Sequence, residues 1–408
     1  MHRTFSWAAA LLLVVGNWAV WPSVAPAEEK PAPKSTATVA EKKALEWSAA
    51  LVKAIDSGQG ATELVDWSCL MARCSKGLDA PPKTVSSFQK GMEEAAASPS
   101  GLFGQIHKEI SQGGGYKYMR TFNDAEGMRI KFRFLPSAGG VNFHDYLLKE
   151  EKGQLRAVDI KIAATGEDFS QSMRRFFIPM AAKENQGLLQ KLVAKENALL
   201  KQAGNLEAMA KAIQENHPEQ VAPIAAKMPA DVRNEKFCLL LEMKAAQMVP
   251  DDKAHQEVIE RFRRLYPQDA AIDLLSMDYF VIKDDLPEAL ACAERFQKSM
   301  GEEAFMQTMI ADLQWQNGKI KESRATISKA IQMEPDFVNA RWTLVTIADS
   351  EKDFATVNKT LQQLVTDFGA ELDPEMMRTE PFYKEFVKSP EFGNLVKFLK
   401  SQPAESGK

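Results

Sequence analysis

Five residues with side chains able to do acid–base chemistry stand close together in the first half of the chain. His144, Asp145 and Tyr146 are consecutive, and Arg156 and Asp159 follow after a short turn. Alternation along a strand puts His144 and Tyr146 on one face and Asp145 on the other. Asp159 would lie across from His144 and Tyr146 if the register of the next strand allows it. A carboxylate beside a buried imidazole can transfer protons; the alternative is a solvated sheet face with cross-strand polar pairs.

Other motifs for catalysis, cofactors or metals are missing from the sequence. No histidine belongs to a His-Glu-x-x-His pair, and neither G-x-x-x-x-G-K-[ST] nor G-x-S-x-G occurs. A triple glycine at 113–115 lacks the Lys-Ser or Lys-Thr of a phosphate-binding loop, so it is interpreted as a turn that leads into a strand. We therefore expect no catalytic residues, no cofactor and no metal site.

Four cysteines are too few to form a disulfide framework in a chain of 408 residues. Cys238 and Cys292 fall at apolar positions of helical patterns, which favours buried free thiols. Cys69 and Cys74 are able to pair only if the helix that carries Cys69 ends between them. The disulfide status of Cys69 and Cys74 stays open at this point.

The residues around the His144 group alternate with a period of two, which is typical of strands. Ile130, Phe132 and Phe134 alternate with charged residues, and short glycine-containing turns separate the apolar runs. Turns this short make neighbouring strands antiparallel. The pattern predicts a meander of three or four strands, with helices before it, at residues 116–122, 128–135, 141–149 and 155–163.

Helices followed by a curved meander resemble the cystatin-like and NTF2-like cone folds, over roughly residues 41–180. The resemblance rests on the order of the elements. It implies an α+β domain able to line a pocket, in which His144, Tyr146 and Asp159 are the candidate residues. A small-ligand-binding or enzymatic role for this domain is thus one hypothesis, with the rest of the chain as its platform.

The second half of the chain repeats itself. Pro267, Gly301, Pro335 and Gly369 stand 34 residues apart, and each follows a helical pattern. A turn at Gly318 splits one such copy into two helical halves. A period of this length predicts stacked helical hairpins. The registered copies cover 236–269, 270–303, 304–337 and 338–371, after a shortened hairpin that begins near residue 204.

In this register the copies resemble the tetratricopeptide repeat, over residues 204–371. The third copy matches best, with Ala311, Ser323 and Ala330 where the family places small residues, but no copy carries the full Trp, Leu-Gly and Tyr signature. The resemblance implies a superhelical solenoid whose first helices form a concave peptide-binding groove. Polar residues that miss the packing positions are the groove candidates: Asp273, Gln307, Gln314 and Arg341. Each of them is equally compatible with a solvated helix face.

The first 27 residues have the features of a secretory signal peptide. A positive start precedes the apolar run from Ala8 to Val15, and Ala25-Pro26-Ala27 supplies the small residues of a cleavage site. Residues 28–40 are polar and contain prolines, so they are interpreted as a flexible leader. We expect a periplasmic or secreted protein without a transmembrane segment in the mature chain; an uncleaved anchor is the alternative, but the apolar run is short for it.

The charge of the chain is unevenly distributed and bears on its partners. Residues 204–408 hold 34 Asp and Glu against 25 Lys and Arg, while the whole chain has a net charge of −4. The excess of acidic residues argues against nucleic acid as a partner of the repeats. A protein or peptide of unknown identity is the expected partner; the sequence leaves the oligomeric state open, and a self-associating structural protein is a further alternative.

Together these patterns predict an α+β domain at 41–182, tetratricopeptide-like repeats at 183–371, a helical cap at 372–400 and a disordered tail at 401–408. The functional expectation is an exported, non-catalytic adaptor or scaffold that binds a protein or peptide on the concave repeat surface.

Overall fold

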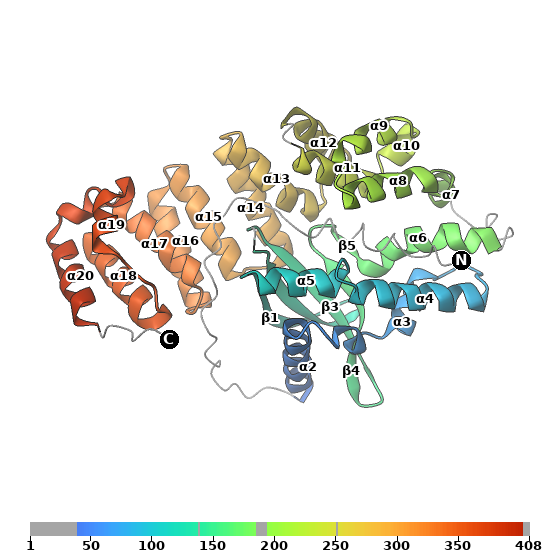
Figure 1. Ribbon diagram of the computed structural model, residues 1–408, viewed down its shortest axis with the longest axis horizontal. Coiled ribbons are helices and arrows are strands. Elements are labelled where there is room, and N and C mark those ends of the chain that lie inside the picture. The colour runs from blue at the N-terminus through green and yellow to red at the C-terminus, as the bar shows by residue number, and fades with distance from the viewer. Residues whose placement is uncertain (1–38, 138, 185–193, 250–251, 403–408) are drawn as a thin grey trace. The chain divides into compact units, whose positions relative to one another are not determined.

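The computed structural model describes residues 39–137, 139–184, 194–249 and 252–402, and it divides them into two compact units. The first unit runs to Tyr279 and the second begins at Phe280, so the division falls inside a helix of the repeats. The predicted signal peptide, most of the leader and residues 403–408 lie outside the described residues. Figure 1 colours the chain from blue at the N-terminus to red at the C-terminus.

The first unit begins with four α-helices and one 3₁₀ turn: α2 (Val39–Asp56), η2 (Ala61–Leu64), α3 (Trp67–Cys74), α4 (Pro82–Ala97) and α5 (Leu102–Ser111). Helix α3 begins where the Asp66 carboxylate accepts a hydrogen bond from the backbone N–H of Cys69 at 2.9 Å, which satisfies a donor of the first turn. Trp47 and Leu51 of α2 are buried on the side of the helix that faces the sheet. These helices position one face of the sheet that follows.

The sheet has five antiparallel strands in the order β1-β2-β3-β4-β5. Four are long and correspond to the predicted strands, and the short β5 was not predicted; the strands are β1 (Gly115–Asp124), β2 (Gly127–Leu135), β3 (Asn142–Glu151), β4 (Gln154–Ile162) and β5 (Glu167–Asp168). Glycines with positive φ at Gly127 (+139°) and Gly153 (+83°) lie at the hairpin turns, where a side chain would be strained. The predicted meander is therefore confirmed, with one strand more than expected.

One face of the sheet is apolar and packs against helix α2. Tyr146 of β3 pairs with Ile130 on one side and Ile160 on the other, and its ring lies 5.2 Å from the Trp47 ring. These side chains are fully buried or nearly so, as the alternation of the sequence indicates. The opposite face carries the charged residues of β2, β3 and β4.

After the sheet the first unit is helical: α6 (Phe169–Glu184), α7 (Ala194–Lys201), α8 (Ala203–Gln214), η4 (Pro218–Gln220), α9 (Val221–Ala226) and α10 (Ala230–Arg233). Phe177 of α6 packs edge-on against Phe88 of α4, with ring centroids 5.2 Å apart, and this contact joins α6 to the first helices. Phe176 packs against Phe237 in the same way at 5.6 Å and joins α6 to the first repeat helix. Helix α6 thus lies between the two parts of this unit.

The repeat helices keep the predicted register throughout. The first helix of each copy begins at Lys236, Ala270, Ala304 or Val338, and each start is 34 residues from the last. The second helices keep the same spacing. The eight helices are α11 (Lys236–Met248), α12 (Asp252–Leu265), α13 (Ala270–Ile282), α14 (Leu286–Met300), α15 (Ala304–Gln316), α16 (Ile320–Met333), α17 (Val338–Ser350) and α18 (Phe354–Phe368).

The turn inside the second, third and fourth copies has a common backbone geometry, and a glycine marks it in the sequence of the third copy alone. Asp284, Gly318 and Lys352 occupy the same position of three successive copies and have φ of +58°, +72° and +57°. Gly318 adopts this left-handed conformation without strain, whereas Asp284 and Lys352 adopt it despite their side chains. The three copies therefore share the geometry of the hairpin turn although the residue type at this position differs.

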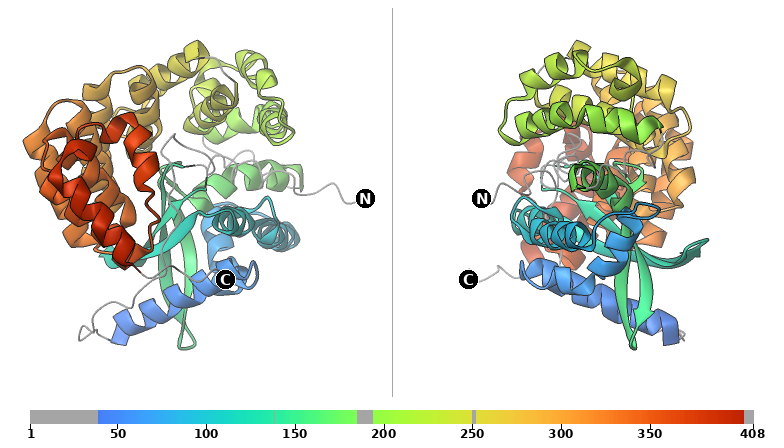
Figure 2. Two further views of the ribbon diagram at one scale, coloured as in Figure 1. Left: turned by 60° about the vertical axis from the view of Figure 1, so that its left-hand side comes forward. Right: turned by 90° about the vertical axis from the view of Figure 1, so that its right-hand side faces the viewer.

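Close packing within the second unit depends on small residues at the helix crossing. Ala311 of α15 and Ala330 of α16 are fully buried, and the Ser323 hydroxyl of α16 donates a hydrogen bond to the Ala311 carbonyl at 2.6 Å. Helices can approach this closely only where no bulky side chain separates them. Helices α15 to α18 therefore stack side by side, as the orange and red ribbons show in both views of Figure 2.

Short helices close the end of the stack: α19 (Pro374–Thr379), η5 (Pro381–Tyr383), η6 (Phe386–Lys388) and α20 (Pro390–Ser401). Phe386, Phe392 and Leu395 are buried in one apolar cluster with Leu361 and Leu364 of α18. A stack of repeats leaves an apolar end face that must be covered, and these helices cover it. The fold is thus an α+β domain followed by a helical solenoid, as predicted.

Among the helices of the described ranges, none is both long enough and apolar enough to cross a membrane.

Candidate functional site

His144 and Tyr146 lie in a buried chain of hydrogen bonds on the apolar face of the sheet. The Tyr116 hydroxyl lies 3.0 Å from Nδ1 of His144 and 2.7 Å from the Tyr146 hydroxyl. Both His144 and Tyr146 are completely buried. Strand alternation puts His144 and Tyr146 on one face, as predicted. Their partner Tyr116 was not predicted, because its position depends on how β1 pairs with β2.

Burial determines the protonation of these groups. It lowers the pKa of His144 to about 3, because a charged imidazolium would lose its hydration there. Burial likewise raises the pKa of Tyr146, while its hydrogen bond with Tyr116 acts in the opposite direction. The un-ionised Tyr116 hydroxyl lies between the neutral His144 imidazole and the Tyr146 phenol, so the three groups are joined without a charge. This arrangement fixes the strands and does not resemble a pair of groups poised for proton transfer.

Asp159 lies on the opposite face of the sheet, so the predicted grouping of the three residues is wrong. Asp159 pairs with Leu147, whereas Tyr146 pairs with Ile160, and this register turns the carboxylate away from His144. Nε of Arg73 in α3 donates to the Asp159 carboxylate at 2.6 Å, and the backbone N–H of Ser170 donates at 3.0 Å. The alternative of a solvated face is also wrong for this residue, because Asp159 is fully buried.

Asp159 belongs to a wider network of charges that links α3, the β1–β2 turn and β5. Arg73 also donates to Glu126 at 3.0 Å, Arg129 donates to Glu126 at 2.7 Å, and Arg129 lies 3.5 Å from Asp168. Burial raises the pKa of Asp168, and the like charges of Asp159 and Glu126 add to this effect. Within the described ranges no His, Cys, Asp and Glu side chains are arranged to hold a metal ion, and we interpret the network as structural.

The four cysteines carry free thiols. Helix α3 continues from Trp67 to Cys74, which puts Cys69 and Cys74 on different faces of one helix. The condition for a Cys69–Cys74 bridge, a helix end between the two, is therefore not met. Cys238 and Cys292 are buried, as expected for their apolar positions.

Of the four groove candidates, Gln307 is buried, whereas Gln314, Asp273 and Arg341 are half-buried. Gln307 of α15 is only 5% exposed, and Oε1 of Gln314 accepts a hydrogen bond from the Thr326 hydroxyl at 2.8 Å. Asp273 belongs to α13 in the first unit and is half-buried. Helix α15 is buried from Ala304 to Leu313, on every side of the helix, which the sequence pattern did not indicate.

Arg341, the fourth candidate, lies half-buried on α17 in the second unit. Its guanidinium stacks over the Phe368 ring, 4.6 Å from the centroid. Its Nη1 atom is buried without a hydrogen-bond partner among the described residues. Burial lowers the pKa of Arg341, against the favourable charges of Asp367 and Asp336. Arg341 therefore has a hydrogen-bond donor that the fold leaves unused.

Asp349, near the C-terminal end of α17, has a buried acceptor atom without a partner within the described ranges, as Arg341 has a buried donor. Its Oδ1 atom is buried and has no hydrogen-bond partner in the described part of the chain. Burial raises the Asp349 pKa, and the nearby Glu385 carboxylate adds to the shift. Sequence reasoning did not select this residue, because a single Asp near a helix end is an ordinary surface pattern.

Aromatic residues lie along the same stretch of the second unit. Trp342 is half-buried on α17 between Arg341 and Asp349. Nε1 of Trp315 in α15 donates to the Ser350 hydroxyl at 2.9 Å, which joins the two first helices near the Asp349 end of α17. We call Arg341, Trp342, Asp349, Ser350 and Trp315 the α17 surface.

The ninth residue is charged in the first three copies of the repeat, and its pKa is shifted in each of them, which the sequence did not indicate. Lys244, Asp278 and Asp312 each occupy the ninth position of their copy. Burial lowers the pKa of Lys244 to about 8 and raises those of Asp278 and Asp312 to about 7 and about 6. This position of the first helices is thus poorly hydrated in three successive copies.

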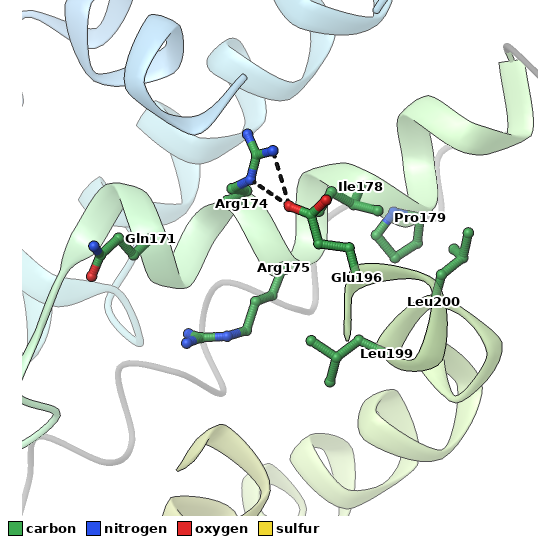
Figure 3. A pocket seen from close by; sticks show the side chains of 8 residues that line it. All are labelled: Gln171, Arg174, Arg175, Ile178, Pro179, Glu196, Leu199 and Leu200. Atoms are coloured by element: carbon green, nitrogen blue, oxygen red, sulfur yellow. Dashed lines mark hydrogen bonds and ion pairs between the residues drawn. The ribbon is translucent and has the colours of Figure 1, made fainter. Parts of the chain in front are cut away.

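A pocket of about 360 Å³ lies between α6 and α7 in the first unit (Figure 3). The Arg174 guanidinium, through Nε and Nη2, contacts Oε1 of Glu196 at 3.0 Å and so links the two helices. Pro179, inside α6, has no N–H to donate to the carbonyl of Arg175, which interrupts the helical ladder at the pocket. The lining residues are Gln171, Arg174, Arg175, Ile178, Pro179, Glu196, Leu199 and Leu200.

The sequence was also compared with known proteins. Neither the models of known protein families nor the curated proteins include a match to this chain.

Proposed function

We propose that this protein is an exported, non-catalytic scaffold that binds an extended segment of another protein on the α17 surface. The repeats would supply a rigid support, and the α+β domain would be a second structural part of the same chain. The observation that supports the proposal is the pair of polar atoms on one helix, Nη1 of Arg341 and Oδ1 of Asp349, that are buried without a hydrogen-bond partner among the described residues. Buried polar atoms are nearly always paired in folded proteins. We infer that both side chains turn outward to pair with a bound segment.

A polypeptide backbone has the chemistry that these two atoms require. Each residue of an extended chain offers one C=O acceptor, suited to Arg341, and one N–H donor, suited to Asp349. Arg341 and Asp349 are eight residues apart on one helix, so their Cα atoms are about 12 Å apart along the axis. That distance corresponds to about four residues of extended chain, which makes a short peptide segment the natural ligand.

The neighbouring side chains supply area for contact. Trp342 and Trp315 are both half-buried, and Trp342 packs in part against the apolar cluster that includes Leu361 and Leu364. Tryptophan and arginine are the residues that most often dominate the binding energy of protein interfaces. The α17 surface therefore combines apolar contact with two directional hydrogen bonds, which is typical of peptide recognition.

The test is a pull-down with the mature full-length chain from an extract of the cell envelope. The double variant Arg341→Gln, Asp349→Asn removes the charge of both groups and shortens the reach of the donor, and we expect it to lose at least one protein that the wild type retains. Lys359→Gln, an exposed change on α18, is the matched control and should retain the same proteins as the wild type. Identical sets of proteins on all three chains would contradict the proposal.

A direct measurement separates binding from chance capture. A retained protein would be divided into overlapping peptides, and their affinities for the wild type, the double variant and the control variant would be measured. Loss of one buried hydrogen bond to a charged group costs about 1.5–3 kcal/mol, so the double variant should bind at least about tenfold more weakly. Peptides that bind all three chains equally would place the contact elsewhere on the protein.

A further inference from the structure

The pocket between α6 and α7 has the walls of a small-molecule site. Ile178 and Pro179 of α6 face Leu199 and Leu200 of α7, and the four side chains make the greater part of the lining apolar (Figure 3). A volume of about 360 Å³ falls in the range of natural ligand pockets. Apolar walls of this kind favour an alkyl or aryl group, since its burial removes hydrocarbon surface from water.

The polar part of the pocket contains two arginines that differ in their partners. Arg174 and Arg175 line it together with the carboxylate of Glu196. Nη1 and Nη2 of Arg175 donate to Glu167 at 2.6 Å each, which balances the Arg175 charge, and Nη1 of Arg174 donates to the carbonyls of Cys74 and Lys76 at 2.9 and 2.8 Å. The two neutral carbonyls hold the Arg174 guanidinium in place, so this group is preorganised.

The Nε and Nη2 side of the Arg174 guanidinium contacts the carboxylate of Glu196. Nε and Nη2 of Arg174 both contact one oxygen of Glu196, and the side chains of Arg174 and Glu196 are 24% and 18% exposed. This edge of a guanidinium is suited to a carboxylate with two oxygens, one for each N–H. The Arg174–Glu196 pair is therefore a contact that a ligand carboxylate could replace.

We propose that the α6–α7 pocket binds an amphipathic monocarboxylate, with its apolar chain against Ile178, Leu199 and Leu200 and its carboxylate against Arg174. Glu196 is then the internal competitor, because it holds the edge of Arg174 that the ligand needs. A cation of the same length has no lone pair to accept the hydrogen bonds of Arg174, and a neutral alcohol gains mainly from the apolar walls. The site is independent of the α17 surface, which belongs to the other unit.

Three probes of equal chain length test the class of ligand. Octanoate, octanol and octylammonium would be titrated into the mature full-length protein by isothermal calorimetry. We expect octanoate to bind most tightly and octylammonium most weakly. Octylammonium binding as tightly as octanoate, or no binding of octanoate to either the wild type or the variant below, would overturn the proposal.

Two substitutions test the site itself, and they have opposite expected effects. Glu196→Gln removes the competing charge and should bind octanoate roughly tenfold more tightly, a factor that corresponds to one charge-assisted hydrogen bond. Leu200→Trp fills the pocket and should weaken octanoate binding roughly tenfold or more. Glu215→Gln, an exposed carboxylate at the end of α8, is the control and should leave the affinity unchanged.

The same variants guard against a trivial loss of folding. Far-UV circular dichroism and the thermal midpoint would be recorded for each chain before titration. A gain in affinity from Glu196→Gln cannot result from unfolding, so this variant keeps the proposal testable even if Leu200→Trp is unstable. Affinity for octanoate that is unchanged or lower in Glu196→Gln would show that Glu196 does not compete, and the proposal would fail.

Discussion

At the scale of single residues, the buried polar groups of the sheet bear directly on the stability of the fold. His144, Tyr116 and Tyr146 satisfy one another in a part of the core from which water is excluded. Such a network stabilises the fold only while every member is paired and uncharged. Two predictions follow from the requirement that His144 stays neutral and that the Tyr116 hydroxyl stays in place.

The folded protein should lose stability in mild acid because of His144. Its pKa is about 3 in the folded state against an ordinary value of 6.5, so the unfolded chain binds the proton first. Stability from this group is fully present above pH 6.5 and falls by about 1.4 kcal/mol per pH unit down to about pH 3. The free energy of unfolding, measured with urea between pH 7 and 4.5, should fall less steeply in His144→Gln than in the wild type.

An exposed histidine provides the control for this measurement. The side chain of His217 is 56% exposed, so His217→Gln should leave the steep part of the wild-type pH dependence in place. Equal slopes for the wild type and His144→Gln would mean that His144 does not carry the effect.

Tyr116→Phe should destabilise the protein by about 1–3 kcal/mol, because it leaves a buried imidazole and a buried phenol without their shared partner. Tyr118→Phe is the matched control: its hydroxyl, 3.0 Å from the Thr121 hydroxyl, is only partly buried, so the cost should be well under that of Tyr116→Phe. Urea denaturation of both variants at pH 7 makes the comparison. A loss of similar size in both would argue against a special role for the buried network.

At the scale of elements, the repeats show how a backbone conformation is kept while the residue varies. Asp284, Gly318 and Lys352 share a left-handed turn, yet only Gly318 marks it in the sequence. The helix starts follow from the apolar spacing and were predictable. The turn conformation of Asp284 and Lys352 was not, since neither residue type requires it and the geometry of the hairpin imposes it.

Glycine-to-alanine changes should therefore have opposite signs at two positions of the second unit. Gly318→Ala forces a side chain into a φ of +72° and should destabilise the protein by about 1–2 kcal/mol. Gly393→Ala lies inside α20, where an added Cβ meets no atom within 4 Å, and should stabilise it by about 0.5–1 kcal/mol. Thermal and urea unfolding check both variants, and a common sign would contradict the argument.

The sheet illustrates what the sequence could and could not determine. Alternation of Ile130 and Phe132 with charged residues indicated the strands and their faces, because the period of two is a local property. The position of Asp159 depended on its register with β3, and a shift of one residue moves a side chain to the other face. The partners of Asp159, Arg73 and Ser170, are 86 and 11 residues away, and no local pattern connects them.

At the scale of the whole molecule, the C-terminal cap of the helical stack should prevent self-association. Phe386, Phe392 and Leu395 share one buried cluster with Leu361 and Leu364 of α18. The cap was predictable from the drift out of the 34-residue register, whereas its contacts were not. An uncovered end of a repeat array presents a continuous apolar surface, which a second copy could cover.

Deletion of residues 390–408 should therefore make the protein self-associate. The deletion removes α20 and exposes the apolar residues of α18 that Phe392 and Leu395 cover. Light scattering of the purified chain should show an increase in mass that grows with concentration. Deletion of residues 403–408 alone is the control and should leave the mass unchanged, and a truncated chain without α20 that behaves like the control would contradict the prediction.

The constant interval between helix starts has a further consequence for how this protein can change. Each copy in the second half begins in phase with the previous one, so a duplicated copy such as 304–337 would add a full hairpin and preserve the phase of all that follows. An insertion of one or two residues in a helix would instead rotate every later side chain away from its neighbours. The stack can thus lengthen by whole 34-residue copies, whereas shorter insertions within a helix would cause misfolding.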